Sequence, residues 1–208
     1  DISDEAFKKE FAAINADASV DGILMLRPLP KQINEQDIEK MIDPAKDLDG
    51  ISPVNIAKVF SGDTSGFAPC TAEAVVCMLK MNDIALSGKR VAVVGRSMVV
   101  GRPLSMLFLH ENATVTICHS RTASLPEVCR EADILTACVG KAAMINHTYV
   151  KKDAVVIDVG INVDENGKLC GDVTAETLEE KSGKLTPVPG GVGAVTTAVL
   201  AKHLVQAA

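Results

Sequence analysis

Aromatic residues and clustered positive charge are scarce in this chain of 208 residues. It has no Trp, one Tyr and five Phe, so its buried core must be aliphatic. A parallel sheet covered by helices suits that composition, because its central strands are apolar on both faces. The net charge is −6 and the two signs are interspersed without a basic stripe. This charge pattern argues against a nucleic-acid-binding surface.

Paired cysteine motifs and membrane-length apolar runs are also missing. The longest uncharged stretch, residues 185–201, contains two Pro and three Gly and is therefore a poor transmembrane segment. The six cysteines form no C-x-x-C pair and fit no zinc spacing. Several lie in apolar runs, which favours small buried side chains in a reducing compartment. We expect a cytoplasmic protein with no nucleic acid, no membrane and no metal as partner.

Strand-like and helix-like segments alternate along the chain, which is typical of an α/β fold with a parallel sheet. A domain boundary is expected near residues 82–88, and residues 43–69, rich in Gly, Pro, Asp and Ser, are interpreted as a long loop. Helices are predicted at 3–15, 35–42, 103–110 and 195–206. Two further helices are predicted from their start signals: one follows Thr71 as N-cap, and the other begins with a capping box formed by Ser124 and Glu127. Strands are predicted at 22–26, 90–94, 114–118, 134–139 and 155–159.

The stretch VAVVGRSMVVGRP, residues 91–103, has the strand, glycine turn and helix of a dinucleotide-binding unit. The usual G-x-G-x-x-G is altered. After Gly95, Ser97 and Val100 stand where glycines are expected, and Gly101 comes one residue late. Backbone N–H groups of such a turn, at the start of a helix, can bind a phosphate. A tight turn without a ligand explains the same residues, so the turn alone leaves both interpretations open.

The end of the next strand discriminates between the two nicotinamide cofactors. An NAD site usually places an acidic side chain there, about 20 residues further on, to bind the ribose 2′-hydroxyl. Here the segment CHSRT, residues 118–122, contains no acid but offers Ser120 and Arg121, and Arg96 lies in the first turn. Two guanidinium groups and a hydroxyl suit a dianionic 2′-phosphate, which favours NADP. The alternative is that Arg121 is merely solvated.

A third segment lies near the C-terminus, where five of the eight residues 186–193 are Pro or Gly. Such a rigid loop can bring bare backbone close to a flat ligand. It could equally be a linker that crosses between domains.

Seven segments together resemble the bifunctional methylenetetrahydrofolate dehydrogenase/cyclohydrolases. They are KDLDG (46–50), PCT (69–71), GRSMVVGRP (95–103), ATVTICHSRT (113–122), DVGIN (158–162), GDV (171–173) and TPVPGGVG (186–193). Their order and spacing match across nearly the whole chain. The resemblance implies oxidation of methylenetetrahydrofolate to methenyltetrahydrofolate with NADP, followed by hydrolysis to 10-formyltetrahydrofolate. This is one-carbon metabolism of the kind that serves purine biosynthesis.

The resemblance also implies an architecture. It is a Rossmann-like NADP-binding domain, residues 85–193, beside an incomplete α/β folate-binding domain, residues 1–84. A C-terminal helix, residues 194–208, would return to the first domain. Members of the family have the folate in a cleft between two domains, and a homodimer is implied.

Residue roles carried over from the family's motifs concern the pterin, the cofactor and the wall of the folate site. Asp49 would bind the amino group and ring N–H of the pterin, with a turn-forming aspartate as the alternative. The cofactor residues would be Gly95, Arg96, Ser97, Gly101, Ser120, Arg121 and Thr122, with Gly140 and Ile161 at the nicotinamide. The folate wall would be Pro189, Gly190, Gly191, Val192 and Gly193. Asp158 is predicted to be structural, and the four His residues to be ordinary surface or capping groups.

Two departures from the family pattern bear on catalysis. The family's catalytic lysine lies in a Y-x-x-x-K motif, whereas the single tyrosine here, Tyr149, starts no such motif. We therefore expect an N-terminally truncated chain, and the alternative function is an NADP-binding module without chemistry. Leu26 replaces the family's Gln, and in a strand its neighbour Arg27 would point the other way. Because Leu26 has no polar atom, it cannot hydrogen-bond to the lysine and adjust the pKa of that residue. The hydrolytic step is therefore the one that this departure is expected to affect.

Overall fold

The computed structural model describes residues 2–174 and 183–208, which fall into two compact units. Unit 1 contains the described residues up to Cys70 together with Ala198–Ala208, and unit 2 contains Thr71–Thr197. The first division lies at the start of helix α4 (Cys70–Met81), ahead of the expected boundary at residues 82–88. None of the described helices is both long and apolar enough to cross a membrane.

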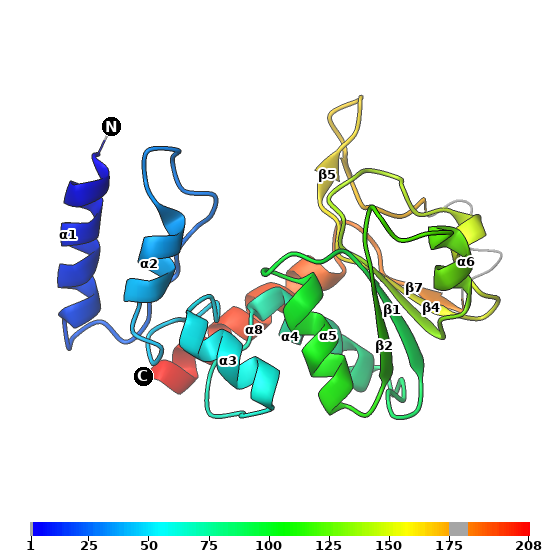
Figure 1. The fold of residues 1–208 in the computed structure, drawn as a ribbon, viewed down its shortest axis with the longest axis horizontal. Coiled ribbons are helices and arrows are strands. Elements are labelled where there is room, and N and C mark those ends of the chain that lie inside the picture. The colour runs from blue at the N-terminus through cyan, green and yellow to red at the C-terminus, as the bar shows by residue number, and fades with distance from the viewer. Residues whose placement is uncertain (1, 175–182) are drawn as a thin grey trace. The chain divides into compact units, whose positions relative to one another are not determined.

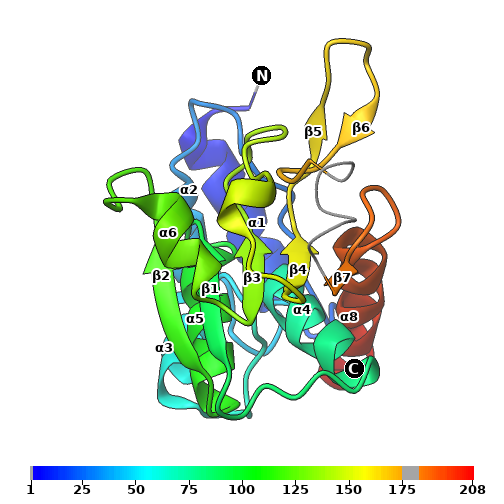
Figure 2. The same cartoon turned by 90° about the vertical axis from the view of Figure 1, so that its right-hand side faces the viewer.

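The described part of unit 2 is built on a sheet of five parallel strands, in the order β2-β1-β3-β4-β7 (Figure 2). The strands are β1 (Arg90–Val94), β2 (Thr114–Cys118), β3 (Ile134–Ala137), β4 (Val155–Asp158) and β7 (Lys184–Leu185). The predictions for β1 and β2 are confirmed, and β3 and β4 end slightly earlier than predicted. Because the strand order changes direction at β1, the carboxyl end of β1 is a topological switch point, where α/β sheets bind ligands.

The core of unit 2 is aliphatic, as the composition predicts. Strand β3 is buried along its whole length, and residues such as Ala92, Leu135 and Val156 pack into one apolar cluster. Thr136 interrupts this apolar layer with a fully buried hydroxyl. Its Oγ1 has no hydrogen-bond partner among the described residues, so this group costs stability.

Helices follow the strands of unit 2, but their starts differ from the predictions. Thr71 lies inside α4 and is not its N-cap. Helix α5 (Gly101–His110) begins two residues early, and α8 (Val192–Ala207) begins three residues early. Ser124 precedes α6 (Leu125–Arg130) with φ of 49°, and its side chain makes no capping hydrogen bond. The predicted capping box is therefore wrong, because this left-handed backbone does not give Ser124 the extended conformation typical of a capping residue.

Short elements that the sequence did not reveal complete unit 2. They are the 3-10 helix η1 (His147–Tyr149) and the antiparallel pair β5 (Asn162–Val163) and β6 (Leu169–Cys170). The β5–β6 hairpin projects above the carboxyl ends of the strands in Figure 2.

Unit 1 contains helices α1 (Asp4–Ala16), α2 (Glu35–Met41) and α3 (Pro53–Ser61) and the end of α8. Helices α1 and α2 lie side by side (Figure 1). Their apolar faces pack around a small core of Phe11, Met25, Ile33, Ile38, Ile42 and Ile51.

Two predictions for unit 1 are wrong. The expected loop at residues 43–69 contains α3, whose start follows ordinary capping rules: Ser52 accepts a hydrogen bond from Asn55 N at 3.1 Å, and Pro53 stands in the first turn. The expected strand at residues 22–26 is only an isolated bridge between Ile23 and Asp47.

Candidate active site

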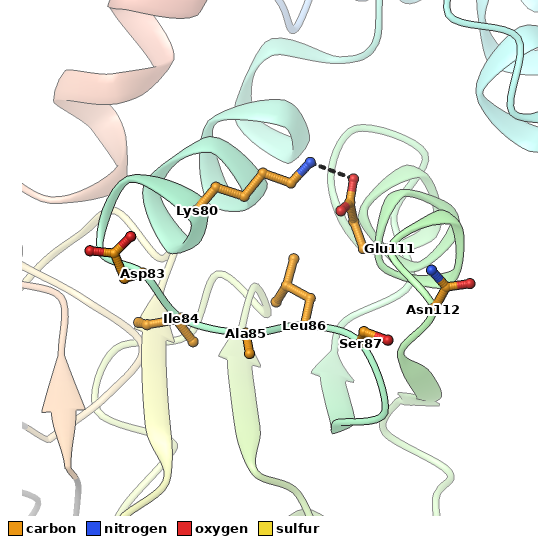
Figure 3. A pocket seen from close by; sticks show the side chains of 8 residues that line it. All are labelled: Lys80, Asp83, Ile84, Ala85, Leu86, Ser87, Glu111 and Asn112. Carbon is orange, nitrogen blue, oxygen red and sulfur yellow. Dashed lines mark hydrogen bonds and ion pairs between the residues drawn. The ribbon is translucent and has the colours of Figure 1, made fainter.

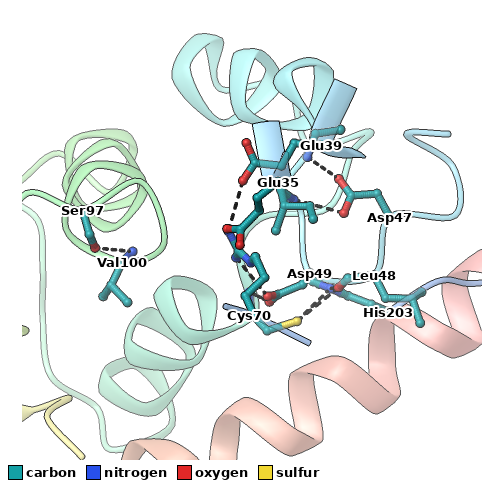
Figure 4. Close-up of polar contacts among 12 residues, drawn as sticks. Glu35, Glu39, Asp47, Leu48, Asp49, Cys70, Ser97, Val100 and His203 are labelled. Atoms are coloured by element: carbon teal, nitrogen blue, oxygen red, sulfur yellow. Dashed lines mark hydrogen bonds and ion pairs between the residues drawn. The ribbon is translucent and has the colours of Figure 1, made fainter. Parts of the chain in front are cut away.

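The glycine turn joins β1 directly to α5. Gly95 has φ of 132°, and a Cβ on this residue would overlap the carbonyl oxygen of Cys138. A Cβ on Gly101 would in turn overlap the carbonyl oxygen of Gly95. Both glycines are therefore required by packing, whether or not a ligand is bound. Ser97 closes the turn by accepting a hydrogen bond from Val100 N at 3.2 Å (Figure 4).

The turn after β2 lies beside the glycine turn. Val94 and Cys118 are register partners at the ends of β1 and β2, and Gly95 N donates to Cys118 O at 2.9 Å. The two turns therefore leave the same edge of the sheet from neighbouring strands, as a cofactor site requires. This edge is the switch point of the sheet.

Hydrogen bonds around His119 hold the second turn in place. His119 N donates to Thr122 Oγ1 at 2.9 Å, and Thr122 N donates to His119 O at 2.9 Å. Arg121 N donates to His119 Nδ1 at 3.1 Å. Thr122 and His119 thus shape the turn that presents Ser120 and Arg121. The role of His119 goes beyond the surface or capping group that was predicted.

The two arginines of this edge, Arg96 and Arg121, are exposed. Neither guanidinium forms an ion pair within residues 2–174 and 183–208. No carboxylate follows β2 in the segment 118–122. Two cations without an ion pair among the described residues therefore lie in neighbouring turns, and the turn of Arg96 leads into the ten-residue helix α5, an arrangement that favours an anionic ligand.

A second part of the site is a cavity of about 270 Å³ within unit 2. Its lining comes from the end of β4 and from the Pro/Gly loop: Asp158 to Ile161, Leu169 and Pro187 to Ala194. The structure therefore brings Ile161 together with all five predicted folate-wall residues, Pro189 to Gly193. Ile161 is 70% exposed, so its apolar side chain is accessible to a ligand at the edge of this cavity.

Asp158 supports the end of β4, in line with its predicted structural role. It is buried and accepts hydrogen bonds from the backbone N–H groups of Gly160, Asp172 and Val173 at 2.9–3.0 Å. Burial raises the pKa of Asp158 against the lowering effect of these three donors. Gly140, predicted to lie at the nicotinamide, has an exposed backbone with φ of 65°.

In unit 1 the motif KDLDG contains two aspartates with different environments (Figure 4). Asp47 is fully buried and accepts hydrogen bonds from Ile51 N, Ser52 N and Asn55 Nδ2 at 2.8–3.0 Å. The side chain of Asp49 is 25% exposed, and its Oδ1 accepts from Cys70 N at 3.2 Å. Asp47 therefore stabilises the turn that leads into α3, whereas Asp49 has a partly accessible carboxylate.

Arg27 lies against Asp49, a partner that the sequence did not predict. Its Nη2 is 3.5 Å from Asp49 Oδ2, and its Nη1 is 3.3 Å from Glu39 Oε1 and 4.0 Å from Glu35 Oε1. Leu26, by contrast, is 77% exposed. The different exposures of Leu26 and Arg27 agree with the prediction that these neighbours point in different directions, although the segment forms an isolated bridge at Ile23 and no longer strand. Burial raises the pKa of Glu39, and the charge of Arg27 opposes that rise.

His203 is another residue that sequence reasoning missed, since it was predicted to lie at the surface. It is 1% exposed, its Nδ1 is 2.8 Å from Leu48 O, and its ring lies 4.9 Å from that of Phe67. It also contacts the buried thiol of Cys70 at 3.5 Å. The C-terminal helix thus helps to hold the segment that carries Asp49. No sequence motif links these residues, because 155 positions separate His203 from Leu48.

A larger cavity of about 450 Å³ lies elsewhere in unit 2, around the segment that leads into β1 (Figure 3). It is lined by the segment from Asp83 to Ser87, with Lys80, Glu111 and Asn112. An ion pair of 2.6 Å between Lys80 and Glu111 crosses it. The described residues that line this cavity include none of the predicted site residues. It is therefore not the candidate site despite its size.

Comparisons with known proteins agree with this geometry. Residues 69–208 match the family model described as tetrahydrofolate dehydrogenase/cyclohydrolase, NAD(P)-binding domain, and residues 1–49 match the catalytic domain of the same family. The bifunctional protein FolD of Clostridium kluyveri is 54% identical over 207 residues, covering 100% of this chain and 73% of that protein.

Solved structures give the same result. The crystal structure of the bifunctional enzyme FolD from Campylobacter jejuni has a TM-score of 0.97 at 39% identity, covering 100% of this chain and 73% of that one. The methylenetetrahydrofolate dehydrogenase-cyclohydrolase of Trypanosoma brucei, complexed with NADP cofactor and inhibitor, has a TM-score of 0.92 at 33% identity, with coverage of 100% and 73%.

Proposed function

Because the chain belongs to the tetrahydrofolate dehydrogenase/cyclohydrolase family, we propose that the protein oxidises methylenetetrahydrofolate with NADP and hydrolyses the methenyl product to 10-formyltetrahydrofolate. One observation carries the proposal: Arg96 and Arg121, which form no ion pair among the described residues, lie in the turns that follow the adjacent strands β1 and β2. An NADP-binding module without chemistry, the alternative function, is not favoured by these bifunctional relatives.

The cofactor assignment rests on the charge of the two turns. Arg121 and Ser120 would hold the 2′-phosphate, and Thr122 shapes their turn. Backbone N–H groups between Gly95 and Gly101, with Ser97 and Arg96, would hold the pyrophosphate and the ribose at the start of α5. The residues present fit NADP better than NAD, because a diol would leave the two cations without a partner.

The nicotinamide and the folate are assigned to the carboxyl ends of β3 and β4. Gly140 and Ile161 would lie at the nicotinamide, and the loop from Pro189 to Gly193 would contact the folate through the cavity that it shares with Ile161. When bound, NADP supplies the acceptor for the hydride that leaves the methylene carbon. The contribution of the chain is to orient both groups for this transfer.

Asp49 is proposed to bind the pterin. Its carboxylate is held at one oxygen by Cys70 N, and its other oxygen faces Arg27. A carboxylate in this position matches the paired N–H groups of the pterin ring and its amino substituent.

Further assignments are part of the same proposal. We propose that the protein is a cytoplasmic homodimer that serves purine biosynthesis and has no nucleic-acid or membrane partner. Half of the cysteines are buried, which is compatible with a reducing compartment. We also propose that residues 1–84 form the folate-binding domain, residues 85–193 the NADP-binding domain, and residues 194–208 the C-terminal helix.

The cofactor site is tested by calorimetric titration with NADP and NAD. Arg121→Ala is expected to weaken NADP binding by about tenfold to a hundredfold, the value of one charge-assisted hydrogen bond, and to leave NAD binding unchanged. Arg90→Ala is the matched control, because Arg90 is an exposed arginine at the opposite end of β1. Equal affinity of the unmodified protein for NADP and NAD would refute the cofactor assignment.

The reaction is tested by following the absorbance of the methenyl product with methylenetetrahydrofolate and NADP, and then its decay. In Asp49→Ala, folate concentrations that saturate the unmodified protein should no longer saturate the reaction rate, while NADP binding is retained. Unchanged folate dependence in this variant would remove Asp49 from the site.

A further inference from the structure

Two buried aspartates connect the loops that follow β3 and β4. Asp172, in the segment after β6, is fully buried and accepts four hydrogen bonds. Three come from consecutive backbone N–H groups after β3: Val139 at 2.6 Å, Gly140 at 3.1 Å and Lys141 at 2.8 Å. The fourth comes from Asn162 Nδ2 at 3.0 Å. One side chain therefore saturates its acceptor capacity with groups from two separate loops.

Asp158 fixes the position of Asp172 in turn. Its carboxylate accepts hydrogen bonds from Asp172 N and Val173 N, both at 3.0 Å. The packing between the two acids leaves no room for side chains on their glycine neighbours. A Cβ on Gly160 would overlap the carboxylate of Asp172, and a Cβ on Gly171 would overlap that of Asp158. We call this arrangement of Asp158 and Asp172 the aspartate latch.

The aspartate latch contains no cation. Within residues 2–174 and 183–208, neither Asp158 nor Asp172 forms an ion pair, and N–H donors take the place of one. The thiol of Cys138 reports on the charge nearby: burial and the negative charge of Asp172 together raise the pKa of Cys138 to about 12. Such an arrangement is costly to bury, and its donors must stay in place to stabilise it.

The loops held by Asp172 are those assigned to the nicotinamide. Gly140 donates directly to its carboxylate, and Asn162 follows Ile161, which lines the cavity beside the Pro/Gly loop. The adenosine end is held by different elements, the turns after β1 and β2. The contacts of Asp172 therefore reach one end of the cofactor site and not the other.

We propose that Asp172 is a positioning residue for the nicotinamide end of NADP. By saturating the N–H groups of residues 139–141 and of Asn162, it sets the backbone at Gly140 and the exposed side chain of Ile161 in the geometry that receives the ring. This inference rests on the proposed function, because it takes NADP as the cofactor.

The test compares two ligands that share an adenosine end, NADP and 2′,5′-ADP, which has no nicotinamide. Asp172→Asn keeps the shape of the side chain but replaces one acceptor oxygen by a donor that faces N–H groups. It is expected to weaken NADP binding by at least about tenfold and to leave 2′,5′-ADP binding within about twofold of the unmodified protein. Asp164→Asn, at the tip of the β5–β6 hairpin, is the matched control and should change neither affinity.

Each outcome decides a separate point. Unchanged NADP affinity in Asp172→Asn overturns the positioning role, and so does an equal loss for both ligands, which would indicate a general defect of unit 2. If this variant does not fold, Asn162→Ala, which removes only one of the four donors, replaces it. A smaller loss for NADP alone is then expected, and no loss refutes the inference. Failure of the unmodified protein to bind NADP would instead refute the proposed function.

Discussion

Replacing the fully buried aspartate of KDLDG, Asp47, should destabilise unit 1 more than replacing the partly exposed one, Asp49. Asp47→Asn is nearly isosteric, so it creates no cavity and changes only the hydrogen bonds. In the native protein Asp47 accepts from Ile51 N at one oxygen and from Ser52 N and Asn55 Nδ2 at the other. The asparagine can keep the second oxygen, but its NH₂ group then faces Ile51 N–H.

The magnitude follows from these three bonds. A hydrogen bond to a charged group contributes about 1.5–3 kcal/mol, and an unsatisfied buried donor costs about 1–3 kcal/mol. Asp47 is fully buried, so water cannot replace the lost acceptor. We expect Asp47→Asn to lower the free energy of unfolding by about 2–4 kcal/mol. Asp49→Asn should lower it by less than about 1 kcal/mol, since this side chain is partly exposed and its ion pair is long.

The assay is urea unfolding followed by far-UV circular dichroism, because the chain has no Trp to report by fluorescence. Amide hydrogen exchange at Ile51 and Ser52 gives a local measurement, and both amides should lose protection in Asp47→Asn. Asp49→Asn is the matched control, with the same chemical change two residues away. The reasoning is refuted if the two variants have the same stability, or if Ile51 and Ser52 stay protected in both.

Three further predictions concern single side chains. Thr136→Val removes a buried hydroxyl without a partner among the described residues and should raise the free energy of unfolding by about 1 kcal/mol; a loss of stability in thermal unfolding would contradict this. The pKa of Cys138 is raised to about 12, so its alkylation by iodoacetamide should be slow at pH 8 and should become faster as the pH rises toward the pKa. Peptide mass spectrometry measures the alkylation rate, and a rate that stops rising below pH 10 would exclude the raised pKa. Arg27→Leu removes the cation beside Asp49 and should raise the KM for the folate by about tenfold, with the KM for NADP unchanged; equal changes in both would assign Arg27 to general stability.

Four strands of the sheet, β1 to β4, could be predicted from the sequence, but the two-residue strand β7 and several local details could not. The segment 90–94 is predictable because a buried central strand needs apolar residues on both faces, and 114–118 because its β-branched residues favour a strand even at the partly exposed edge of the sheet. Helix α3 was missed because its Gly- and Pro-rich flanks resemble a loop, although Ser52 and Pro53 signal its start. The contact between Arg27 and Asp49 could not be predicted, because it joins two segments that are separate in the sequence.

The sequence by itself determined the family and the cofactor class, because both depend on short motifs that can be read without a structure. It also predicted the residues of the candidate site, and these stay predictions. The tertiary structure alone decided which of two aspartates in KDLDG is exposed, that His203 packs against Leu48, and that Asp172 connects two loops. The reason is physical. A motif records which groups are present, whereas burial and hydrogen-bond partners depend on segments brought together from distant positions in the chain.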